Sequence, residues 1–262
     1  MRAPTFARSL RVTVLVLVMG SFAAACNQAD AIREEALAKS TEVTFETADG
    51  VTLAGRLFGP DDATAGVVLA HMLPSDQSSW FDFAQRLGSI GYRAVTFDFR
   101  GYCPGGDAGC SEGKKTISAM WQDVLAAKAF LESKGVARVA LVGASMGGTA
   151  SLVAAAQVPT EVEAVVTLSA PTSIEGLTAG PDVLQASGAA KQFMAGDGDT
   201  TAAQAASAFY EQALQPKRLE ILTTSDHGTD LLTGNQGEIA RTSILTWLGR
   251  YLPVTAPTAE SP

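Results

Sequence analysis

The chain has 262 residues, of which 47% are hydrophobic and 18% are charged, and its formal net charge is −8. This length allows one large domain or two small ones, and the apolar fraction is large enough to exclude a wholly disordered chain. An acidic chain without a basic cluster is a poor partner for nucleic acid. The two histidines argue against a histidine-rich metal site, and the three cysteines, an odd number, require an explanation.

Residues 1–25 have the features of a secretory signal peptide. Three arginines and an apolar run at 12–19 precede a series of small residues that ends before Cys26. The run is shorter than the ~20 residues of a transmembrane helix, although an uncleaved N-terminal anchor is an alternative. Removal of residues 1–25 takes away three arginines and no acid, so the formal net charge becomes −11. Such a chain would not adhere to anionic lipid by charge.

The residues before Cys26 allow two kinds of cleavage. Ala23-x-Ala25 suits ordinary signal peptidase, whereas the same small residues resemble a bacterial lipobox, with Ala23 where leucine is commonest. The lipobox implies that Cys26 is diacylated and that residues 26–40 form a lipidated N-terminus and a polar tether. We then expect an exported protein of the cell envelope that contacts membrane through its lipid only. Asn27 favours the outer membrane if the source is a diderm bacterium, again by resemblance.

The other two cysteines, Cys103 and Cys110, lie in the segment CPGGDAGC. Two neighbouring thiols in an exported protein usually oxidise, and the Gly- and Pro-rich loop between them can bend enough to close a disulfide. Two free thiols are the alternative. No histidine or further cysteine lies near in the sequence, which disfavours a zinc site.

Strand and helix patterns alternate from residue 41 to residue 252. A hairpin of strands at 42–47 and 51–58 turns at Asp49-Gly50. Further strands are predicted in chain order at 66–70, 92–99, 136–142, 163–169, 191–195 and 219–223. Helices are predicted between them at 80–90, 120–135, 149–157, 202–214 and 238–252.

These elements predict one α/β domain over residues 41–252. Its sheet is expected to be mostly parallel and doubly wound, with an N-terminal antiparallel hairpin. The segment at 170–190 is too short for a large cap domain, which favours an open pocket and small acyl groups. Residues 253–262 are polar and Pro-rich and are predicted to form a disordered tail.

A candidate nucleophile follows the strand at 136–142. The sequence Gly143-Ala144-Ser145-Met146-Gly147 is a G-x-S-x-G motif between a predicted strand and a predicted helix. Bulky side chains at 143 and 147 would clash with a serine in a strained turn. The helix N-terminus beneath would favour a developing oxyanion.

A serine nucleophile needs a base and an acid that orients the base. His227 follows the strand at 219–223 and precedes the last helix, so it should face the same sheet edge as Ser145. Asp199 follows the strand at 191–195 and is the preferred acid. Asp197, two residues earlier in the same loop, and Glu175 are alternatives.

The loop after the strand at 66–70 is placed to form an oxyanion hole. Its backbone N–H groups would do this, and the best pair is Leu73 with Met146, the residue after the nucleophile. Met72 is the alternative to Leu73. His71, at the start of this loop, is expected to be structural and to fix the loop by hydrogen bonds.

The ordered segments LAHMLPSDQSSW, YRAVTFDFRG, GASMGG, GDGD and SDHG resemble the α/β-hydrolase superfamily, in particular its small lidless branch of dienelactone hydrolases and carboxylesterases. The resemblance covers residues 41–252 and implies serine hydrolysis with no metal or organic cofactor. Ser145, Asp199 and His227 follow the order typical of that superfamily. Three features depart from it: Met72 replaces the usual glycine, Ala144 replaces the usual histidine, and the cysteine loop is inserted before Ser111.

The sequence therefore predicts a lipid-anchored serine esterase that acts on a small ester through an acyl-enzyme. An acyltransferase or peptidase with the same three residues is one alternative. A non-catalytic binding lipoprotein of the cell envelope is another. The sequence specifies neither the substrate nor the oligomeric state.

Overall fold

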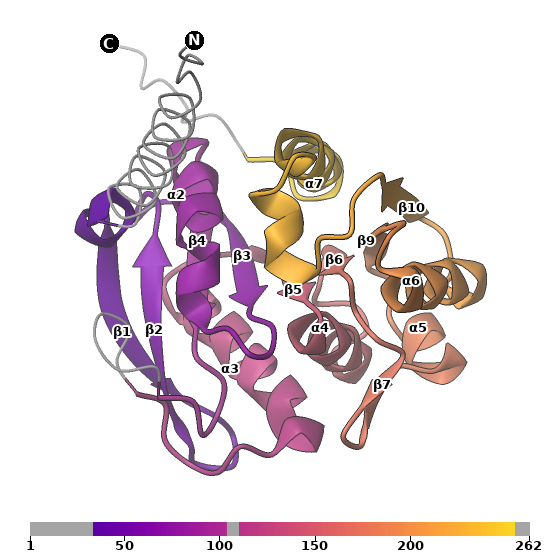
Figure 1. Ribbon diagram of the computed structural model, residues 1–262. Helices are drawn as coiled ribbons and strands as arrows, with labels where there is room; N and C mark the ends of the chain where they lie inside the picture. The colour runs from indigo at the N-terminus through magenta and orange to yellow at the C-terminus, as the bar shows by residue number, and fades with distance from the viewer. Residues whose placement is uncertain (1–33, 104–109, 255–262) are drawn as a thin grey trace, which may run out of the picture.

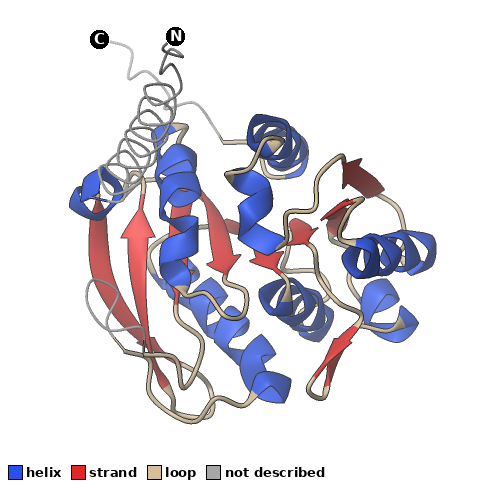
Figure 2. Ribbon diagram, viewed as in Figure 1, coloured by secondary structure: helices blue, strands red, loops and turns tan. Residues whose placement is uncertain are grey.

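The computed structural model describes residues 34–103 and 110–254 (Figures 1 and 2). The predicted signal peptide, the lipidation site at Cys26 and most of the predicted tail at 253–262 lie outside the described residues. Within them, no helix is both long enough and apolar enough to cross a bilayer.

An eight-stranded sheet forms the centre of the described chain, in the order β1-β2-β4-β3-β5-β6-β9-β10. The first two strands are an antiparallel hairpin, and β2 also runs antiparallel to β4, whereas the other neighbours are parallel. The strand bounds are β1 Ser40–Glu46, β2 Thr52–Phe58, β3 Ala65–Ala70, β4 Arg93–Phe97, β5 Arg138–Ala144, β6 Ala164–Leu168, β9 Ala190–Gly196 and β10 Lys217–Leu222. The predicted α/β fold, mostly parallel with an N-terminal hairpin, is confirmed.

Helices cover both faces of this sheet, which explains why β3, β6 and β9 are buried along their whole length. One apolar core lies under α3, α4 and α6, and the other lies under α2 and α7 (Figure 1). The helix bounds are α2 Phe81–Ser89, α3 Met120–Ser133, α4 Met146–Gln157, α5 Pro181–Ala186, α6 Thr200–Gln212 and α7 Gly237–Tyr251. Short 3₁₀ turns lie at η1 Gln77–Trp80, η3 Ile117–Ala119 and η4 Gly228–Leu232.

Three segments differ from the sequence prediction or add to it. Helix α4 begins at Met146, three residues earlier than predicted, because the turn at Ser145 leads directly into it. Residues 34–38 are helical and Ala36 is fully buried in the core, so this part of the predicted tether packs on the domain. The segment at 170–190 contains only the two-residue strands β7 Ser173–Ile174 and β8 Leu177–Thr178, followed by α5. It forms no large cap domain.

The described chain enters and leaves at the amino edge of the parallel strands. Ser40 pairs with Phe58, which in turn pairs with Ala94 near the start of β4. At the other end, the Tyr92 hydroxyl donates to the carbonyl of Leu252 at 2.9 Å. The opposite, carboxyl edge is therefore free for the loops that carry Ser145 and His227.

Candidate active site

Ser145 occupies a strained turn between β5 and α4. Its φ of 47° and ψ of −117° lie outside the conformations that side-chain-bearing residues ordinarily adopt. Its N–H donates to Leu168 O at 2.7 Å, and its carbonyl accepts from the N–H of Gly148 at 2.9 Å. These bonds hold the turn in place at the carboxyl edge of the sheet.

The two glycines of the motif permit close backbone contact, as the sequence predicts. A Cβ at Gly143 would lie 2.3 Å from Gly147 O. A Cβ at Gly147 would lie 2.3 Å from Ala70 O and 2.5 Å from His71 O. The nucleophile turn therefore rests directly on the end of β3, where the predicted oxyanion loop begins.

The two predicted oxyanion donors lie on either side of this contact. Met146 is the first residue of α4, and Leu73 is half-buried in the loop after β3. Neither backbone N–H donates a hydrogen bond to any residue in the described part of the chain. Met146 N–H also lies at a helix N-terminus, where the helix dipole favours negative charge.

His227 lies in the loop between β10 and η4, and Asp199 is the residue beside it. Nδ1 of His227 lies 2.5 Å from Oδ2 of Asp199. The other carboxylate oxygen, Oδ1, accepts from Ala202 N–H at 3.3 Å and so caps α6. The helix cap and the imidazole thus fix the same carboxylate from two sides. Among the described residues, His227 Nε2 and Ser145 Oγ have no hydrogen-bond partner.

The loop of His227 packs against both of the other loops. Gly228 has a φ of +59°, and a Cβ there would lie 2.3 Å from Met72 Sδ and 3.5 Å from Ala144 Cβ. The Thr229 hydroxyl donates to the same sulfur at 3.7 Å. Met72 therefore connects the oxyanion loop to the histidine loop.

The alternative acids lie elsewhere. Asp197 has an exposed side chain, although it is in the same loop as Asp199. Glu175 is exposed in the turn between β7 and β8, with a φ of 42°. Of the three candidates, Asp199 is the carboxylate that contacts the imidazole of His227.

His71 is fully buried at the start of the oxyanion loop, and both of its ring nitrogens have partners. Nδ1–H donates to Met72 O at 2.9 Å, and Nε2 accepts from Phe99 N–H at 3.1 Å. Burial lowers the pKa of His71 to about 4, so the ring is neutral at physiological pH. These contacts match the structural role that the sequence predicts for His71.

The segment after β4 packs beside the site through buried polar residues for which the sequence predicts no role. Burial raises the pKa of Asp98 to about 6, and its carboxylate accepts from the backbone and side-chain nitrogens of Gln77 at 2.9 and 2.7 Å. The Arg100 guanidinium binds both Asp49 and the buried Asp123. The only sequence signal for these residues is the family motif that contains Asp98 and Arg100.

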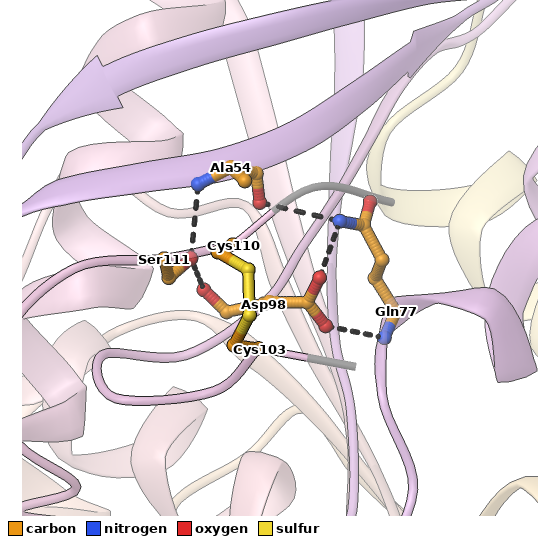
Figure 3. The surroundings of a disulfide bond; sticks show 6 residues. All are labelled: Ala54, Gln77, Asp98, Cys103, Cys110 and Ser111. Carbon is orange, nitrogen blue, oxygen red and sulfur yellow. Dashed lines mark hydrogen bonds between the residues drawn. A yellow bond between two sulfur atoms is a disulfide. The ribbon is translucent and has the colours of Figure 1, made fainter. Parts of the chain in front are cut away.

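A disulfide joins Cys103 to Cys110, as predicted, beside this segment (Figure 3). Next to it, the Ser111 hydroxyl donates to Asp98 O and accepts from Ala54 N–H. In residues 34–103 and 110–254, no group of three or more His, Cys, Asp or Glu side chains is arranged to hold a metal ion.

Comparisons with known proteins agree with this fold. A family model described as the alpha/beta hydrolase fold matches residues 67–251. The structure is similar to an esterase of Pyrococcus furiosus, Pf2001, with 19% identity, a TM-score of 0.68 and coverage of 82% of this chain and 92% of that one. A dienelactone hydrolase from Anabaena variabilis gives 22% identity and a TM-score of 0.66, covering 82% and 99%. A thermophilic esterase from Thermogutta terrifontis gives 17% and 0.65, covering 81% and 99%. No curated protein matches the sequence.

Proposed function

Because this chain belongs to the α/β-hydrolase fold family, we propose that it is a serine hydrolase that cleaves small carboxylic esters. The observation that carries this proposal is the meeting of three loops at one sheet edge. They supply a serine in a strained turn, two backbone N–H groups that no described residue pairs with, and a histidine in contact with a carboxylate. Acyl transfer to water needs these three elements: a nucleophile, an oxyanion hole and an oriented base.

In the proposed acylation step, His227 Nε2 takes the proton of Ser145 as Oγ attacks the ester carbonyl carbon. The carbonyl oxygen becomes an oxyanion, which the N–H groups of Leu73 and Met146 stabilise. The C–O bond to the leaving alcohol then breaks, and imidazolium returns the proton to that oxygen. Loss of one oxyanion donor would raise the barrier by roughly 3–4 kcal/mol.

In the proposed deacylation step, neutral His227 removes a proton from water, which attacks the acyl-enzyme. The second tetrahedral intermediate collapses to the acid and restores Ser145. Asp199 keeps the proton on Nδ1, so that Nε2 faces the reacting atoms, and it stabilises the imidazolium electrostatically. The capping bond to Ala202 fixes the carboxylate for this role.

The small size of the β7–β8 and α5 segment supports an open site and small acyl groups, because it provides no large cap over the carboxyl edge. Similarity in fold to esterases and a dienelactone hydrolase supports an ester as the bond that is cleaved.

Hydrolysis of p-nitrophenyl esters of graded acyl length tests the proposal. We expect turnover that is greatest for short acyl chains and that is abolished in Ser145→Ala and His227→Ala. Addition of alcohols, amines and peptides distinguishes an acyltransferase or peptidase by its products. A folded chain that hydrolyses none of these substrates but binds a small ester would instead be the non-catalytic binding protein.

We further propose that the protein is exported and anchored in the cell envelope through lipid on Cys26. The described chain enters and leaves at the amino edge of the sheet, opposite Ser145, which supports this arrangement. An anchor at that side leaves the candidate active site facing away from the membrane. Metabolic labelling with an alkynyl fatty acid in a bacterial host should label the protein but not Cys26→Ser. Equal labelling of both would contradict the proposal.

A further inference from the structure

The His71 ring is one of the groups that hold the oxyanion loop. Residues 71–74 form neither helix nor strand, so side-chain contacts contribute to the position of the Leu73 N–H. The His71 ring does this from within the loop, through its bond to Met72 O at 2.9 Å. The bond from Phe99 N–H to Nε2 ties the same ring to the end of β4.

Two aromatic rings pack against His71 and set its tilt. The Phe99 ring lies edge-on, with centroids 4.9 Å apart and an interplanar angle of 63°. The Tyr102 ring packs in the same manner, at 4.7 Å and 72°. Edge-to-face contacts of this kind contribute beyond the area that they bury. Two hydrogen bonds and two ring contacts thus determine the orientation of the imidazole.

Tyr102 is half-buried and contributes its ring, not its hydroxyl, to this arrangement. Within the described residues no group lies in hydrogen-bond geometry with the buried hydroxyl oxygen, and the Lys115 ammonium interacts with it electrostatically. The Lys115 ammonium lies over the ring, 4.5 Å from its centroid. Replacement by phenylalanine would therefore keep the contact with His71.

A short ladder holds Tyr102 in place. Gly101 N–H donates to Glu112 O at 2.8 Å, and Ser111 N–H donates to Tyr102 O at 2.9 Å. The disulfide between Cys103 and Cys110 is a covalent cross-link between the same two segments, next to these hydrogen bonds. Figure 3 shows how Ser111 connects this ladder to the carbonyl of Asp98 and the N–H of Ala54.

We propose that Tyr102 is a positioning residue for the oxyanion hole, that it acts through His71, and that the Cys103–Cys110 disulfide holds it there. The inference rests on the proposed function. According to this proposal, the Cys103–Cys110 disulfide affects the rate of catalysis through Tyr102, and no atom of Tyr102 need touch the substrate. Because the oxyanion forms only in the transition state, loss of the Tyr102 ring should lower kcat and leave KM unchanged.

The test is steady-state hydrolysis of p-nitrophenyl acetate by Tyr102→Ala, Tyr102→Phe and the double variant Cys103→Ser/Cys110→Ser. Tyr210→Ala is the matched control, since Tyr210 is also half-buried with a lysine ammonium 4.8 Å from its ring centroid, but lies on α6. We expect kcat to fall about tenfold in Tyr102→Ala with KM unchanged, since small displacements of catalytic groups are costly.

Tyr102→Phe should retain the wild-type kcat. The double cysteine variant should lower kcat by less than Tyr102→Ala does, again with KM unchanged. The control Tyr210→Ala should have the wild-type kcat. The shape of the pH–rate profile should not change, because none of these substitutions alters Ser145, Asp199 or His227. If Tyr102→Ala does not fold, Tyr102→Leu keeps apolar volume without a ring and gives the same comparison.

Wild-type kcat in Tyr102→Ala or Tyr102→Leu, or an equal loss in Tyr102→Phe, would overturn the role of Tyr102 while leaving the proposed function intact. Wild-type kcat in the double cysteine variant would remove the disulfide from the proposal. A wild-type protein that does not hydrolyse the ester overturns both the proposed function and this inference.

Discussion

Gly147→Ala tests whether the close approach of the nucleophile turn to β3 is needed for activity. In a helix, alanine is favoured over glycine by about 1 kcal/mol, so propensity alone predicts stabilisation. The new Cβ, however, would lie 2.3 Å from Ala70 O and 2.5 Å from His71 O. Both are backbone oxygens of a fully buried segment, so α4 must move away by about 1 Å to restore ordinary contact.

This movement displaces the N–H of Met146 relative to the oxyanion loop. A misplacement of about 1 Å at catalytic groups can cost about 10²-fold in rate, and overpacking of this kind costs about 1–3 kcal/mol in stability. We therefore expect Gly147→Ala to lower kcat by about 10²-fold and to lower the free energy of unfolding, because the overpacking cost outweighs the gain in propensity.

Gly249→Ala is the matched control for this substitution. Gly249 also lies inside a helix, α7, but nothing lies within 4 Å of the position that a Cβ would take. We expect the control to raise the free energy of unfolding by about 1 kcal/mol and to leave kcat unchanged. Urea denaturation and ester hydrolysis measure both quantities. Equal effects of the two substitutions, or full activity in Gly147→Ala, would refute the steric reasoning.

Two further predictions concern carboxylates. Asp199→Asn keeps an oxygen that can cap α6 but removes the charge beside His227, so kcat should fall by about 10³–10⁴-fold with little change in the free energy of unfolding. Asp199→Ala should lose the same activity and also about 1 kcal/mol of stability, because it removes the cap. Equal stability of the two variants would contradict a role of Asp199 in capping α6. Burial raises the pKa of Asp98 to about 6 from an ordinary value of 3.8, so the folded protein favours the protonated form and stability should decrease as pH rises from about 4 to 6. Denaturation at several pH values should show this decrease in wild type and a flatter profile in Asp98→Asn, and parallel profiles would argue against it.

Much of the fold follows from local sequence patterns. The strands β3, β5 and β6 are mostly apolar, which is typical of strands covered on both faces, and their alternation with helices along the chain predicts parallel pairing. The start of β9 is harder to recognise because it contains Lys191 and Gln192. Both are buried, and their partners are distant or irregular: the carbonyls of Ser187 and Ala189 for the lysine, and Ser243 of α7 for the glutamine.

The residues of the candidate site also fall into those that local sequence predicts and those that it does not. Motif and position were enough to propose Ser145 and His227 from the sequence, because each follows a strand that ends at the same edge. The choice between Asp199 and Asp197 depends on the path of one loop, which local sequence does not specify. The packing of Tyr102 on His71 joins residues whose contact depends on how two loops fold together, and no periodic pattern reports it.

We propose above that Ser145 is a nucleophile activated by His227. Incubation with a fluorophosphonate, followed by mass spectrometry of the peptide that contains residue 145, measures this directly. We expect one phosphonyl group on Ser145 in the wild-type protein, none in Ser145→Ala, and strongly slowed labelling in His227→Ala. An unlabelled, folded wild-type protein, or labelling at an undiminished rate in His227→Ala, would contradict it.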